Sequence, residues 1–314
     1  MLARAAVSTR HPVLVTLVVT RRCNLACGYC NEYDHVSQPV PTEALLARVD
    51  RLADMGTSIV TISGGEPLLH PELDRVVAHI RRRGMVATVI TNGYPLTRRW
   101  VERLNEAGLD YLQISIDNVK PDAVSRKSLD LLDRKLELLA ETARFAVNVN
   151  SVVGAGVENP EEALVVAERA RELGFSPTIG VIHDGRGQLR PLNERQRAVY
   201  KAIRRRSGVG FGVVDSFETN LAEGKPTNWR CRAGARYFYV DEHGLVHWCS
   251  QQRGKPGIPL ERYTEVDMRR EYLREKPCAP RCTIQCVHRA SLMDEWRHPQ
   301  SRTVGASVRD GSSR

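Results

Sequence analysis

The feature that most constrains the fold is a regular alternation of short apolar runs and amphipathic stretches. The apolar runs are rich in β-branched residues and too short to span a bilayer, so they predict strands over 13–19, 58–63, 86–91, 111–117, 146–153 and 177–182. The amphipathic stretches predict helices over 42–55, 73–83, 97–107, 129–143, 160–173 and 193–206. Parallel neighbours need crossover connections, so the pattern predicts an α/β fold with a parallel sheet, either doubly wound or a barrel.

Residues that carry chemistry follow these strands. Cys23, Gly64, Thr91, Ser115 and Asn150 each lie at or just after the carboxyl end of a different predicted strand. In either parallel architecture ligands bind at this edge of the sheet. We therefore expect one functional site there.

Three thiols follow the first strand within eight residues. Cys23, Cys27 and Cys30 stand at spacings of four and three, and Gly28 allows a tight loop that turns them towards one point. Soft thiolates suit an iron–sulfur cluster or zinc. His35 offers a fourth ligand for a structural zinc, whereas an iron–sulfur cluster held by three thiolates keeps one position open.

This arrangement resembles the radical S-adenosylmethionine (radical SAM) superfamily. The segment Cys-x3-Cys-x2-Cys, with Tyr29 before its last thiol, is similar to that family's cluster loop, and Ser63-Gly64-Gly65-Glu66-Pro67 is similar to its GGEP motif. The resemblance implies a partial (β/α)6 TIM-like barrel and a [4Fe–4S] cluster whose open iron binds S-adenosylmethionine. It further implies reductive cleavage to a 5′-deoxyadenosyl radical that abstracts a hydrogen atom, with an external one-electron donor such as flavodoxin or ferredoxin.

The resemblance also assigns contacts with the cofactor. Gly64 and Gly65 are expected to approach the methionyl amine closely. Thr91 and its neighbour Asn92 either reach the cofactor or only form a turn, and Asn150 is preferred to Asn148. The full set of expected cofactor-binding residues is Tyr29, Gly64, Gly65, Glu66, Pro67, Thr91, Ser115, Asp117 and Asn150.

A second set of thiols lies near the carboxyl terminus. Cys231 and Cys249 flank a predicted hairpin, and twelve residues separate Cys231 from Gly244, as in the SPASM and twitch auxiliary-cluster domains. Cys278, Cys282 and Cys286 follow at spacings of four, which on a helix would place them on one face. The resemblance implies an auxiliary [4Fe–4S] cluster with one spare thiol; structural zinc is the alternative.

Composition and motif positions suggest three segments. We expect a radical SAM barrel over 11–210, a small cysteine-rich twitch/SPASM-like domain over 211–297 and a disordered tail over 298–314. The 46 basic and 37 acidic residues are interspersed, so neither nucleic acid nor membrane is an expected partner. Eight cysteines in metal-type spacings indicate a reducing compartment, and hence the cytoplasm.

The substrate is not identified by any motif. We expect a small molecule of a biosynthetic pathway, because peptide maturases usually carry an additional N-terminal domain and the first strand begins early in this chain. A peptide maturase of the SPASM class and a non-catalytic metal-binding protein are the alternatives. His183, Asp184 and Arg186 are expected to overhang the substrate space.

Overall fold

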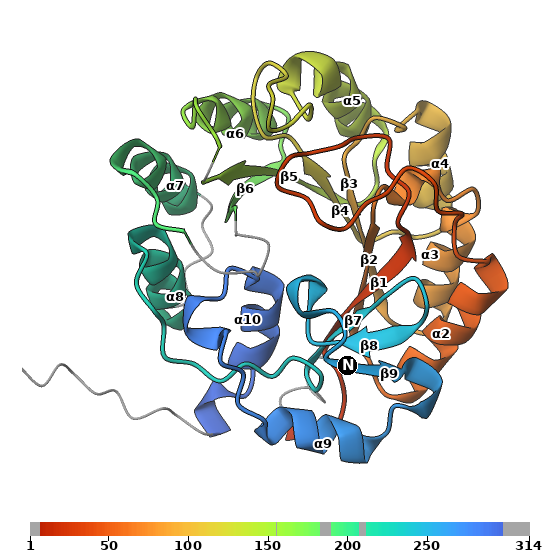
Figure 1. Cartoon of the computed structure of the whole chain (residues 1–314). Helices are drawn as coiled ribbons and strands as arrows, with labels where there is room; N and C mark the ends of the chain where they lie inside the picture. Colours follow the sequence, from red (N-terminus) through yellow and green to blue (C-terminus); the bar gives the residue numbers. More distant parts are fainter. Residues whose placement is uncertain (1–6, 155, 183–189, 207–211, 298–314) are drawn as a thin grey trace, which may run out of the picture.

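The computed structural model describes residues 7–154, 156–182, 190–206 and 212–297. A single nine-stranded sheet runs through the molecule in the order β6-β5-β4-β3-β2-β1-β7-β8-β9. Helices α2 to α8 form an arc outside it (Figure 1). The fold is therefore an α/β partial barrel, as the alternation and the resemblance predicted.

The first six strands are parallel neighbours in chain order, and each lies within two residues of its predicted range. Their bounds are β1 Leu14–Thr20, β2 Ile59–Gly64, β3 Val86–Thr91, β4 Tyr111–Ser115, β5 Ala146–Val153 and β6 Ser176–Val181. Buried apolar side chains of these strands form the core with the inner faces of the helices. Because all six strands point the same way, their carboxyl ends meet at one edge.

The helices of the barrel follow the predicted amphipathic stretches. Their bounds are α2 Thr42–Asp54, α3 Leu73–Arg82, α4 Arg98–Glu106, α5 Leu129–Thr142, α6 Glu162–Glu172 and α7 Glu194–Arg206. In α3 the residues Leu73, Val76, Val77 and Ile80 are buried, which is the one-sided pattern expected of a helix packed on a sheet. Helix α8, Gly212–Glu223, was not predicted.

The carboxyl-terminal region extends the same sheet. Strand β7, Tyr237–Val240, pairs in parallel with β1, and the antiparallel strands β8, Leu245–His247, and β9, Pro256–Pro259, complete the sheet. The predicted hairpin around Glu242-His243-Gly244 is thus confirmed, but its attachment to β1 was not foreseen. The division of the chain near residue 210 stays a prediction.

Cys278, Cys282 and Cys286 do not share one helix, so the proposed common helical face is wrong. A short 3-10 helix, Ala279–Arg281, separates Cys278 from Cys282, and Cys286 lies in α10, Gln285–Leu292. Pro277 and Pro280 explain the break, because proline lacks the N–H that a continuing helix needs. Helix α9, Glu265–Leu273, precedes them.

Some predictions concern residues beyond the described ranges. His183, Asp184 and Arg186, and the tail from residue 298, are among them. None of the helices that the structure describes is both long and apolar enough to cross a membrane.

Candidate functional site

The turn after β2 packs directly on the cysteine loop. Gly64 has φ of +141°, and a Cβ there would lie 2.1 Å from the carbonyl oxygen of Thr20. A Cβ on Gly65 would lie 2.3 Å from the carbonyl oxygen of Arg21 and 2.4 Å from that of Arg22. Both positions therefore require glycine for the close approach of two backbones, which is a different reason from the cofactor contact that the motif led us to expect.

Glu66 holds this turn to the end of β3. Its carboxyl is fully buried and accepts hydrogen bonds from Leu68 N–H (2.9 Å), the Thr91 hydroxyl (2.6 Å) and Asn92 N–H (2.7 Å). Pro67 is buried beside it at the start of the 3-10 helix Pro67–Leu69. Thr91 thus supports Glu66, while the Asn92 amide reaches Asn24 in the cysteine loop at 2.8 Å.

Glu66 gives the fold a predictable dependence on pH. Burial raises the pKa of its carboxyl to about 7, although the three hydrogen bonds oppose the shift; the ordinary value is about 4.3. The folded chain then binds this proton more tightly than the unfolded chain does. Protonation of Glu66 stabilises the folded chain fully at pH values below the pKa of Glu66 in the unfolded chain. As the pH rises from there through the pKa of Glu66 in the folded chain, this part of the free energy of unfolding is lost, by up to about 1.4 kcal/mol per pH unit.

We therefore expect the Glu66→Gln variant to lack that part of the pH dependence. Urea unfolding of the iron-free chain at a series of pH values between the two pKa values measures it. Glu141→Gln, which changes an exposed acid on α5, is the control and should retain the wild-type slope. An unchanged slope in Glu66→Gln would show that its carboxyl does not titrate in this range.

The three thiols of the cysteine loop are close neighbours. Burial, reinforced by nearby charges including that of Cys27, raises the pKa of Cys30 to about 11, and the pKa of Cys23 is raised in the same way. His35 turns its Nδ1 to the carbonyl of Cys23, at 3.0 Å. Among the described residues no three His, Cys, Asp or Glu side chains form a site for a single metal ion.

Lys127 was missed by the sequence reasoning and lies at the centre of the site. Its Nζ contacts the Tyr29 hydroxyl and lies 3.0 Å from Asp117 Oδ2, and the Tyr29 hydroxyl donates to the same oxygen at 2.6 Å. The attraction of Asp117 and Tyr29 raises the pKa of Lys127 although its burial opposes this. Lys127 also interacts electrostatically with Cys27 and Cys30, so the cysteine loop faces a buried cation.

Ser115, Asp117 and Asn150 lie on the adjacent ends of β4 and β5. Ser115 and Asn150 are paired across the two strands, and Thr178 donates a hydrogen bond to the Asn150 side chain at 2.9 Å. Asn148 is buried and its amide donates to the Ser176 carbonyl at 2.5 Å. A cavity of about 240 Å³ lined by Tyr29, Asp117 and Val152 opens beside these strand ends. Asp117 Oδ1 is buried without a hydrogen-bond partner there.

Four of the five thiols in the second set interact with one another. Electrostatic interactions join every pair among Cys231, Cys249, Cys278 and Cys282. Burial is the main cause that raises the pKa of Cys231 to about 11 and of Cys249 to about 12. Cys286 also interacts electrostatically with Cys249, but its thiol is hydrogen-bonded with the hydroxyl of Tyr237 on β7.

Contacts also join the two cysteine regions. Asn31, which follows Cys30, exchanges hydrogen bonds of 3.0 and 3.3 Å with Gln251, two residues after Cys249. The Tyr239 hydroxyl on β7 donates to the buried carboxyl of Glu32. The pairing of β7 with β1 therefore places both sets on one continuous framework.

The geometry defines a parallel barrel with a cysteine loop and a glycine turn at its carboxyl edge, and comparison with known proteins identifies the class. The model of the Radical SAM superfamily matches residues 17–190. The chain is 35% identical over 278 residues to "PqqA peptide cyclase" of Xanthomonas campestris pv. campestris (strain B100), covering 80% of this chain and 70% of that protein. The chain therefore belongs to the radical SAM superfamily of enzymes.

Other relatives match over shorter stretches. "Fe-coproporphyrin III synthase" of Methanosarcina barkeri (strain Fusaro / DSM 804) is 35% identical over 114 residues, 35% of this chain and 28% of that protein. The alignments with this synthase and with two further PqqA peptide cyclases of Xanthomonas cover 28% to 36% of the length of those proteins. Among solved structures, anSMEcpe with bound AdoMet and Cp18Cys peptide shares the fold, with a TM-score of 0.61, 15% identity, and coverage of 91% of this chain and 98% of that chain.

Proposed function

We propose that the chain binds a [4Fe–4S] cluster through Cys23, Cys27 and Cys30 and cleaves S-adenosylmethionine reductively. The single observation that carries this is the packing of the Gly64-Gly65 turn on the backbone of the cysteine loop, which aligns both family motifs at one edge of the barrel. When bound, the reduced cluster and S-adenosylmethionine supply a 5′-deoxyadenosyl radical that removes a hydrogen atom from the substrate.

The protein's own residues prepare this site. Glu66 fixes the turn, and Asn92 braces the cysteine loop through Asn24. The buried Lys127 cation places positive charge beside two cluster thiolates, which favours the reduced cluster and raises its potential. The cavity beside Tyr29 and Asp117 would hold the adenosine part of the cofactor, with the free Asp117 oxygen available to a hydroxyl.

We further propose that Cys231, Cys249, Cys278 and Cys282 bind an auxiliary [4Fe–4S] cluster, leaving Cys286 as the spare thiol. The pairwise interactions among the four thiols support this choice, as does the separate bond of Cys286 with Tyr237. Four thiolates complete such a cluster without an open position. Its role would then be electron transfer or support of the substrate, and not cleavage of S-adenosylmethionine.

For the substrate class, the comparisons favour the alternative stated above, a peptide maturase, over the small-molecule enzyme that we expected. We expected a small molecule, but two relatives that each match about four fifths of this chain are named for a peptide cyclase. The number of residues before β1 does not decide the question. We therefore propose a peptide as substrate; a small molecule is the second candidate, because Fe-coproporphyrin III synthase is also a relative.

Isotope transfer tests this proposal. The anaerobically reconstituted chain is given S-adenosylmethionine, a strong reductant and perdeuterated peptides encoded beside its gene. We expect 5′-deoxyadenosine, with deuterium incorporated only in the presence of the true substrate. Unlabelled 5′-deoxyadenosine with every peptide, but labelled product with a small molecule, would reject the peptide. Stoichiometric zinc and no 5′-deoxyadenosine would reject the radical chemistry itself.

A further inference from the structure

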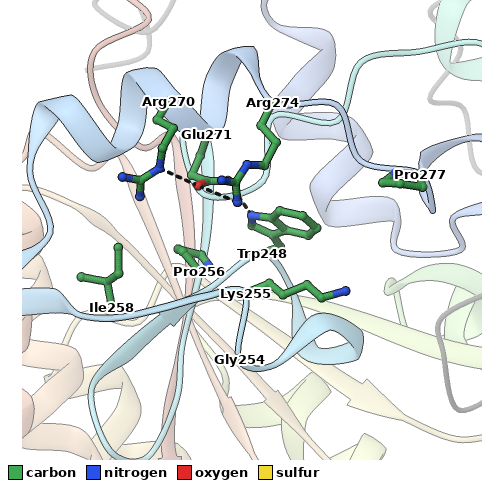
Figure 2. Close-up of a pocket in the computed structure, with 9 residues that line it drawn as sticks. All are labelled: Trp248, Gly254, Lys255, Pro256, Ile258, Arg270, Glu271, Arg274 and Pro277. Atoms are coloured by element: carbon green, nitrogen blue, oxygen red, sulfur yellow. Dashed lines mark hydrogen bonds and ion pairs between the residues drawn. The ribbon is translucent and has the colours of Figure 1, made fainter.

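A cavity of about 590 Å³ is lined by residues of β9 and α9 and of the segments next to them (Figure 2). Three basic side chains, Lys255, Arg270 and Arg274, line it, with Glu271 as the acid among its lining residues. Its wall also includes Trp248 and Pro277, which immediately precede Cys249 and Cys278 in the chain. Two residues of its wall are thus the chain neighbours of two proposed cluster ligands.

The acid in this cavity is already satisfied. Glu271 is fully buried, accepts a hydrogen bond from the Trp248 indole at 2.8 Å, and lies 3.2 Å from Arg270 Nε and 3.3 Å from an Arg274 nitrogen. Both arginine side chains remain nearly half exposed. Lys255 is exposed, and its ammonium hydrogen-bonds with the neutral side chain of Gln252 at 3.1 Å. The cavity therefore presents net positive charge to solvent.

The thiols near the cavity differ in exposure. Cys231, Cys249 and Cys282 are buried, whereas Cys278 is partly exposed. Lys255 interacts electrostatically with Cys278, and its ammonium lies 5.7 Å from the centre of the Trp248 ring. Cys278 is thus the most exposed of the four proposed ligands, and the cations of Lys255 and Lys276 act on it.

We propose that this cavity is the docking surface for an acidic protein that carries one electron. The inference rests on the proposed auxiliary cluster and adds its external partner. The cationic wall attracts the acidic carrier, and the partly exposed Cys278 lies on the side of the proposed cluster where the electron would enter. Where the carrier is a flavodoxin, its flavin hydroquinone anion would lose one electron and become the neutral semiquinone. A cluster held by Cys231, Cys249, Cys278 and Cys282 would take up that electron, and no proton is transferred.

Stopped-flow mixing of reduced flavodoxin with the cluster-loaded chain tests the proposal. At low ionic strength we expect Lys255→Glu to lower the second-order rate constant of semiquinone formation about tenfold. Arg274→Gln should lower the same rate constant about threefold. Glu271 retains its contacts with Arg270 and Trp248 in this variant, so its carboxylate stays paired. Both effects should vanish at high salt. The matched control is Arg269→Glu, an exposed change on α9 outside this cavity with the same change in net charge as Lys255→Glu.

Equal rates for these three variants, with both clusters present, would overturn the docking surface alone. The docking surface is equally rejected if the cavity variants weaken binding of an acidic peptide and leave the flavodoxin rate unchanged. The electron paramagnetic resonance spectrum tests whether a second cluster is present. If Cys249→Ala has the same spectrum as the wild-type chain, there is no second cluster, and both the proposed auxiliary cluster and the docking surface are rejected. A chemical reductant should support wild-type levels of 5′-deoxyadenosine in Lys255→Glu, Arg274→Gln and Arg269→Glu, which separates docking from catalysis.

Discussion

Cys27→Ala should abolish cleavage of S-adenosylmethionine. Cys27 is the middle thiol of the loop and interacts electrostatically with both Cys23 and Cys30. The proposed cluster is bound by three thiolates, and its fourth iron is left for S-adenosylmethionine. Two thiolates are too few to hold it, so the first cluster should be lost entirely. Iron should fall from about eight to about four atoms per chain. Iron analysis and chromatography of 5′-deoxyadenosine measure both effects.

Two other cysteines provide matched controls for this result. Cys286→Ala should keep about eight irons and full cleavage, because that thiol hydrogen-bonds with Tyr237 and is outside the proposed set of four. Cys249→Ala should lose the second cluster and retain part of the cleavage. If Cys27→Ala and Cys249→Ala fail equally, the second set contributes only to folding. If Cys286→Ala loses iron, our choice of the spare thiol is wrong.

The barrel could be predicted because its signals are local. Each strand and helix from β1 to α7 carries its own apolar period, and the cysteine and glycine motifs follow β1 and β2. The pairing of β7 with β1 has no such signal, since it joins residues more than two hundred positions apart. The attachment of the cysteine-rich region to the barrel therefore required the structure.

Within the site, motifs predicted residue positions better than residue roles. The two glycines are expected to approach a ligand, which stays a prediction, and their missing Cβ atoms also allow backbone to pack on backbone. Lys127 stands in a polar segment between β4 and α5 with no motif around it, so only the fold brings it to Tyr29 and Asp117. Five thiols in the second set left the ligands open, because spacing alone does not reveal that Tyr237 contacts Cys286.

The structural link between the cysteine regions bears on how the two proposed clusters work together. Glu32 contacts Tyr239 of β7, and Asn31 pairs with Gln251 beyond Cys249, so the first cysteine loop rests on the framework of the second. A disturbance at the second set is thus transmitted to the loop that follows Cys30. This is the physical reason to expect only partial cleavage in Cys249→Ala.

Gly65→Ala should severely disrupt the contact between the glycine turn and the cysteine loop. Its Cβ would lie within 2.6 Å of three backbone atoms of Arg21 and Arg22, and backbone cannot rotate away as a side chain can. The turn must then separate from the cysteine loop and lose the hydrogen bonds of Gly65 N–H to Thr20 (2.8 Å) and Glu66 N–H to Arg22 (2.9 Å). We expect a loss of about 3 kcal/mol of unfolding free energy or more, measured by urea unfolding of the iron-free chain.

The same change should prevent assembly of the first cluster and spare the second, which iron analysis would show as about four atoms per chain. Gly180→Ala on β6 is the control, because its Cβ would meet its nearest neighbour, a Val152 methyl group, at an ordinary 3.7 Å. That variant should keep both clusters and lose little stability. The opposite outcome is a Gly65→Ala chain that is as stable as Gly180→Ala and keeps full iron and full cleavage. It would show that the two backbones do not approach as closely as the structure places them. The alignment of both motifs at one edge of the barrel would then lose its physical basis.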